Sequence, residues 1–142
     1  MEQRNFVSFD WPIDESDEQR ENYDVVPPGR AILERIRNAL ASRGFDVAPV
    51  CQHKFYGWCF DSKFNGVTVW TMLQHPGPWF LISEPRQSLL KRLFGRDQTE
   101  PLATVCSAIG AFLSNSPDAT SIQWFSRSEF RTQEGATGAE SS

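Results

Sequence analysis

The chain has 142 residues, about one average domain, with 18 acidic against 14 basic side chains and 39% hydrophobic residues. This composition excludes a disordered polyelectrolyte, and no apolar run approaches the roughly 20 residues that span a bilayer. Three cysteines are too few for a disulfide framework and are typical of a reducing compartment. Because the N-terminus also lacks a basic start and an apolar stretch, we expect a cytoplasmic protein with no membrane partner.

Most of the negative charge lies at the N-terminal end. Residues 1–29 hold eight acidic and two basic side chains, whereas residues 30–142 hold ten acidic and twelve basic ones. Residues 132–142 carry no large apolar side chain, which is typical of disorder. The sequence therefore predicts an acidic N-terminal segment with a short strand (1–28), a single α+β domain (29–131) and a disordered tail (132–142).

In chain order, the first predicted element is a short strand at residues 6–11. The clearest helix follows at about 29–43, where apolar residues recur at helical spacing from Ile32 to Leu40. The later elements are β-rich runs at 45–51, 55–61, 67–74 and 79–84, a short helix around Leu89–Phe94, a helix from Thr99, and a strand at 121–127. This order predicts an α+β fold: an antiparallel β-meander of about four to six strands, with the amphipathic helix of the N-terminal half and two later helices packed mainly on one face.

The turns of the meander predict which residues share a face. Asn65-Gly66 is a strong two-residue hairpin signal, and a second turn centred on Pro76-Gly77 pairs Gln74 with Trp79. Because side chains alternate along a strand, one face lies under the helices and the other presents a mixed apolar centre. On that second face lie the candidate partner-binding residues Trp70, Met72, Trp79 and Leu81. A slip of one residue in either hairpin reverses these assignments.

Two interpretations of the second face stay open. In the first, residues 1–28 cover it, with Phe6, Phe9 or Trp11 packed against it. In the second, it is a surface that binds a partner, because tryptophan and methionine are enriched in interface cores.

Charged residues form two further groups. The segment from Asp10 to Asp24 is either a solvated linker or a surface for a basic partner. Its central acids, Asp14, Glu15, Asp17 and Glu18, are candidates for partner binding. A basic patch accompanies the short helix and comprises Arg86, Lys91, Arg92 and Arg96. We interpret this patch as a solvated helix face, and nucleic acid is not an expected partner.

No motif predicts catalysis, a metal or a cofactor. The cysteines and histidines lack the spacing of a zinc site, and Cys51 and Cys59 lie on opposite faces if Gln52 pairs with Phe55. A nucleophilic pair such as Cys59 with His75 lacks a third, orienting group. Buried thiols are the expectation for all three cysteines.

These features favour a small non-enzymatic module that binds another protein through its acidic segment and its aromatic sheet face. Small acidic inhibitors, immunity proteins and secretion chaperones belong to this class. One alternative is an enzyme or small-molecule binder whose pocket lies between sheet and helices and uses Cys59, His75 or Arg86. A second alternative is a structural homodimer paired through an edge strand or the tryptophan face.

Overall fold

The computed structural model describes residues 3–12, 29–54, 57–74, 78–86 and 99–132. Its strands are β1 (Phe6–Asp10), β2 (Asp46–Val47), β3 (Cys51–His53), β4 (Gly57–Phe64), β5 (Val67–Gln74), β6 (Trp79–Pro85) and β7 (Thr120–Phe125). Its helices are α1 (Arg30–Ser42), α3 (Thr99–Ser114) and α4 (Arg127–Thr132). All paired strands are antiparallel, so the predicted α+β fold with an antiparallel sheet is confirmed.

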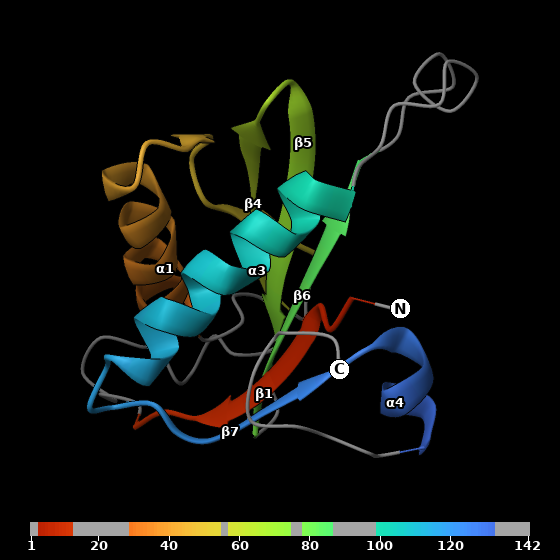
Figure 1. Ribbon diagram of the computed structural model, residues 1–142. Helices are drawn as coiled ribbons and strands as arrows, with labels where there is room; N and C mark the ends of the chain where they lie inside the picture. Colours follow the sequence, from red (N-terminus) through yellow and green to blue (C-terminus); the bar gives the residue numbers. More distant parts are fainter. Residues whose placement is uncertain (1–2, 13–28, 55–56, 75–77, 87–98, 133–142) are drawn as a thin grey trace.

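The sheet runs in the order β2-β4-β5-β6-β1-β7, and β3 pairs with β4 as well. The first strand of the chain lies inside the sheet, where Val7 pairs with Leu81 of β6 and with Trp124 of β7 (Figure 1). Residues 6–10 are thus a sheet strand and do not lie across a sheet face. Trp11, just beyond this strand, stacks against Phe112 of α3.

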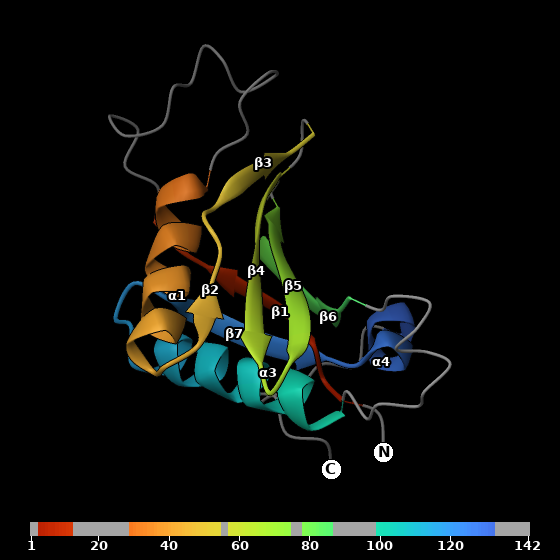
Figure 2. The same cartoon turned by 90° about the horizontal axis from the view of Figure 1, so that it is seen from above.

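The helices α1 and α3 pack on the same face of the sheet (Figures 1 and 2). In α1 the buried residues recur three to four positions apart, which forms a single apolar stripe. They are Ile32, Leu33, Ile36 and Leu40. From α3, Val105 and Ile109 join the same core, which the sheet closes with residues such as Val69 and Leu73. Burial of each such side chain stabilises the fold by roughly 1.5–3 kcal/mol.

The hairpin of β4 and β5 has the register that its turn predicts. Asn65 and Gly66 adopt φ angles of +51° and +75°, as a tight two-residue turn requires, and Phe64 pairs with Val67. The pairing continues to Gly57 opposite Gln74. This strand pair therefore presents its two faces as the sequence predicts.

The register predicted for β6 is wrong by one residue. Gln74 pairs with Phe80 and not with Trp79, so every side chain of β6 points to the face opposite to the one expected. Trp79 and Leu81 consequently lie under the helices, where they are only 2% and 1% exposed. Four consecutive residues of this strand are apolar, so alternation alone does not indicate its register.

The chain enters α1 at a glycine packed directly on Trp79. Gly29 has a φ of +110°, and a Cβ atom there would lie 2.7 Å from Cζ3 of Trp79 and 3.2 Å from Cδ2 of Leu73. A residue with a side chain would meet both an unfavourable backbone conformation and the core. The absence of a side chain lets α1 begin in contact with the sheet.

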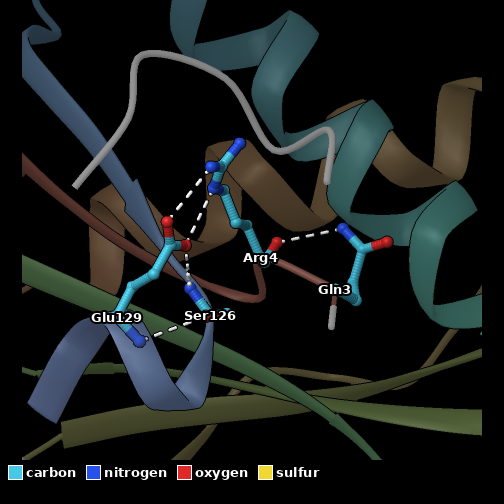
Figure 3. Close-up of polar contacts among 4 residues, drawn as sticks. All are labelled: Gln3, Arg4, Ser126 and Glu129. Atoms are coloured by element: carbon cyan, nitrogen blue, oxygen red, sulfur yellow. Dashed lines mark hydrogen bonds and ion pairs between the residues drawn. The ribbon is translucent and has the colours of Figure 1, made fainter. Parts of the chain in front are cut away.

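An ion pair joins Arg4, just before β1, to Glu129 of α4 (Figure 3). Arg4 donates two hydrogen bonds to the Glu129 carboxylate, at 2.8 and 3.1 Å. Glu129 also accepts a bond from the backbone N–H of Ser126, whose hydroxyl accepts one from the N–H of Glu129. This reciprocal arrangement is a capping box for α4. The Arg4 side chain, with help from Ser126, lowers the pKa of Glu129 from 4.5 to about 2.

The other expected elements are found only in part. The run at 45–51 is divided into β2 and β3, with Pro49 between them. The helix expected around Leu89–Phe94 lies outside the described residues, as does most of the expected tail. Within the described ranges, no helix is both long and apolar enough to cross a membrane.

Candidate functional site on the open face of the sheet

We call the side of the sheet that faces away from α1 and α3 the open face. Its composition follows from the observed register, because alternate residues of each strand point to it. Its members in β3, β4 and β5 are Cys51, His53, Cys59, Asp61, Lys63, Thr68, Trp70, Met72 and Gln74. In β6, β1 and β7 they are Phe80, Ile82, Glu84, Phe6, Ser8, Gln123 and Phe125.

A half-buried tryptophan stands near the middle of this face. The Trp70 ring meets the His53 ring edge to face, with 5.4 Å between the ring centroids. The guanidinium of Arg86, which follows β6, lies 5.9 Å from the centroid of the same indole. A cation at this range is attracted by the negative face of the ring. A residue of β3 and the residue that follows β6 therefore converge on one aromatic side chain of β5.

Arg86 is held in place by a carboxylate. Its Nε donates a 2.7 Å hydrogen bond to Oδ1 of Asp61, the residue directly opposite Trp70 in the sheet. The two side chains are 56% and 36% exposed, so this ion pair contributes little to stability. Its effect is positional, because it orients an accessible guanidinium beside the half-buried indole of Trp70. We call Trp70, His53, Asp61 and Arg86 the tryptophan patch.

Two thiols lie beside this patch. Cys51 and Cys59 are directly paired across β3 and β4, and their sulfur atoms are 3.5 Å apart. The prediction that these residues lie on opposite faces is wrong, because Gln52 pairs with Trp58 and not with Phe55. The expected burial holds for Cys59 but not for Cys51, which is exposed.

Burial raises the pKa of the Cys59 thiol, and the Cys51 thiol adds to the rise, while a hydrogen bond from the Trp70 side chain opposes it. The third thiol is remote from the open face: Cys106 lies in the α3 core, where burial raises its pKa to about 12. Cys51 is therefore the thiol that a reagent in solution meets first.

Four phenylalanines occupy another part of the open face. Phe130 of α4 lies over Phe6, Phe80 and Phe125, with ring centroids 4.9 to 6.0 Å apart. Phe130 is 37% exposed and is the most accessible large hydrophobic side chain among the described residues. α4 thus caps the β1, β6 and β7 side of this face, and the tryptophan patch lies beyond it.

The structure places the predicted site residues in three environments. Trp70 and Arg86 lie together on the open face, as partners in one contact. Met72 is on the same face but only 6% exposed, and Trp79 and Leu81 belong to the core under the helices. Outside the described residues lie Asp14, Glu15, Asp17, Glu18, Lys91, Arg92 and Arg96.

Sequence reasoning missed His53 and Asp61 as members of the patch. The pairing of Asp61 with Trp70 follows from the register of the β4–β5 hairpin, which could have singled out this carboxylate. His53 needed the register of β3 on β4, which depends on a connection longer than the assumed two-residue turn.

Apolar side chains from the sheet and the helices pack in the space between these two layers, and the buried hydroxyls of Thr71 and Ser83 hydrogen-bond to each other at 3.1 Å. Among the described residues, every buried side-chain polar atom has a hydrogen-bond partner, and no three His, Cys, Asp or Glu side chains cluster as metal ligands. Cys59 and Arg86 point away from this space, so neither lines a pocket there.

Comparisons with family models, curated proteins and solved structures found no match to this chain.

Proposed function

We propose that this chain is a non-enzymatic module that binds another protein, with the tryptophan patch as its anchor. The observation that carries the proposal is Trp70, an aromatic side chain half-exposed on the sheet face opposite the helices and flanked by an oriented guanidinium. Tryptophan and arginine are the residues most enriched among those that dominate binding energy. A partner with an apolar pocket for the indole, and an acidic group for Arg86, suits this surface.

The acidic N-terminal segment supplies the second part of the proposal. Seven acidic side chains and one basic side chain lie between Asp10 and Asp24. Charge of one sign accelerates encounter with a partner of opposite charge more than it stabilises the final complex. We expect the partner to carry a basic surface as well as a pocket for Trp70. A cytoplasmic location fits this proposal, since three cysteines are too few for a disulfide framework.

The test is parallel affinity capture from native lysate with the wild-type chain and three single variants. Trp70→Ala is expected to lose a captured partner by about 30-fold, because central anchors contribute about 2 kcal/mol or more. Arg86→Ala is compared with Arg43→Ala, an exposed arginine at the end of α1, away from the patch. We expect a loss only for Arg86→Ala.

Reversing the charge of four acidic side chains tests separately whether the N-terminal segment accelerates association with the partner. Changing Asp14, Glu15, Asp17 and Glu18 to lysine is expected to slow association and to flatten its dependence on salt. A captured partner that binds all these variants as tightly as the wild type contradicts the proposal.

Two other functions give different outcomes. If the chain forms a homodimer through the same face, light scattering is expected to show the mass rising from that of a monomer to that of a dimer as the concentration increases. In Trp70→Ala the mass is then expected to stay that of a monomer. A small-molecule binder predicts a thermal shift in a ligand screen, since a ligand at 100 times its Kd adds about 2.7 kcal/mol. The alternative of a pocket between sheet and helices gains no support from Cys59 and Arg86, because both lie on the open face.

A further inference from the structure

The paired thiols on the open face are not used by the proposed binding function. Cys51 and Cys59 sit directly opposite each other on neighbouring antiparallel strands. Residues so paired have Cα atoms about 4.5–5.5 Å apart, which lies inside the range of about 4.4–6.8 Å that disulfides span. Because the two sulfur atoms are already 3.5 Å apart, side-chain rotation is enough to bring them within bonding distance.

The two thiols also differ in access, as the two roles in thiol–disulfide exchange require. Cys51 is exposed on β3, whereas Cys59 is buried on β4 behind it. An exposed thiol can attack a reagent from solution, and a buried neighbour can then resolve the adduct without meeting the reagent itself. Cys106, buried in the α3 core, has neither access nor a neighbouring thiol among the described cysteines.

We propose that Cys51 and Cys59 form a dithiol–disulfide site that small-molecule disulfides of the glutathione class oxidise reversibly. In the first step, the Cys51 thiolate attacks one sulfur of the oxidant RSSR. A bond forms between Cys51 Sγ and that sulfur, the S–S bond of the oxidant breaks, and RS⁻ leaves and takes up the proton that Cys51 lost. In the second step, the Cys59 thiolate attacks Cys51 Sγ and expels the second RS⁻, which takes up the proton from Cys59.

The electron balance closes with no further reagent. Two protein thiols are oxidised to one disulfide, and one RSSR is reduced to two RSH. The reverse pair of steps, with RSH as reductant, restores both thiols. This site is distinct from the tryptophan patch in its chemistry, although Trp70 touches Cys59.

The experiment exposes the full chain to buffers with graded ratios of reduced to oxidised glutathione. Free thiols are then blocked with an alkylating reagent, and each cysteine is assigned by peptide mass spectrometry. We expect one Cys51–Cys59 disulfide per chain in oxidising buffer, its loss in reducing buffer, and Cys106 as a free thiol throughout. Cys106→Ser is the matched control and is expected to behave as the wild type.

The single variants separate the two roles. Cys59→Ser is expected to stop at a mixed disulfide of glutathione on Cys51, because nothing resolves it. Cys51→Ser, which changes an exposed side chain, is expected to leave Cys59 unmodified. The proposal is wrong if wild-type Cys51 stays a thiol at every ratio, if the wild type stops at the mixed disulfide, or if the disulfide joins two chains. Circular dichroism of each variant verifies that the fold is retained.

Discussion

Replacement of Gly29 by alanine tests the packing of α1 on the sheet and the position of Trp79. The backbone there has a φ of +110°, and holding a residue with a side chain in such a conformation costs about 1–3 kcal/mol. The new Cβ would also lie 2.7 Å from a ring carbon of Trp79, which is 2% exposed and has little room to move. Forcing extra volume into a packed core costs about 1–3 kcal/mol. Alanine restricts the unfolded chain and returns about 0.4–1 kcal/mol. The expected net loss is about 3 kcal/mol.

Gly44 provides a matched control on the other end of the same helix. It has a similar φ of +93°, but a Cβ atom there meets nothing within 4 Å. Gly44→Ala therefore carries the backbone cost without the collision, and a loss of about 1 kcal/mol is expected. Urea unfolding followed by circular dichroism measures the free energy of unfolding of both variants. The two losses can be compared directly when the m values of the variants agree. Equal losses for the two variants would refute the close contact between Gly29 and Trp79, and with it the corrected register of β6.

Three further predictions concern the remaining contacts. The pKa of Glu129 is about 2 in the folded state against 4.5 ordinarily, so its stabilising effect is complete above pH 4.5 and is lost as the pH falls toward 2. Glu129→Gln is therefore expected to lower the urea midpoint at neutral pH and to reduce its decline across that interval. Phe130→Ala is expected to cost about 1–2 kcal/mol, less than a fully buried phenylalanine, because its ring is 37% exposed. Formation of the Cys51–Cys59 disulfide is expected to raise the free energy of unfolding by up to about 2.5 kcal/mol, measured in oxidising against reducing buffer, since the closed loop is short.

For each of these three predictions, one experimental result would contradict the structural reasoning. If the urea midpoint of Glu129→Gln falls between pH 4.5 and 2 as steeply as that of the wild type, Arg4 and Ser126 do not stabilise the Glu129 carboxylate in the folded state. A loss as large as that of a core phenylalanine in Phe130→Ala would place this ring deeper than the structure does. A lower stability in oxidising than in reducing buffer would show that the disulfide strains the β3–β4 pair.

Local signals in the sequence predicted the β4–β5 hairpin well. A two-residue turn at Asn65-Gly66 leaves only one register for the strands beside it, so the predicted face of Trp70 is confirmed. The next connection is different, because Gln74 pairs with Phe80 across an odd number of intervening residues. Its proline and glycine indicate a turn but do not determine its length, and the apolar run that follows fits either face.

Long-range contacts were beyond the reach of such signals. The position of β1 between β6 and β7 depends on partners far away in the chain, and nothing in residues 6–10 indicates them. The contact between Arg86 and Trp70 also needs the assembled sheet, and the pairing of Cys51 with Cys59, although local, depends on how β3 lies on β4. Each arises only after the sheet has assembled, which is why the candidate site could be predicted as Trp70 but not as a patch.

The most direct test of the binding proposal is hydroxyl-radical footprinting of the five tryptophans, in the free chain and with the captured partner bound. Trp70 and Trp11 are both half-buried, on opposite sides of the sheet, whereas Trp58, Trp79 and Trp124 are buried. We predict that the partner protects Trp70 from oxidation and leaves Trp11 as reactive as in the free chain. Protection of Trp11 with Trp70 unchanged would place the partner on the helical side and contradict the proposed role of the open face.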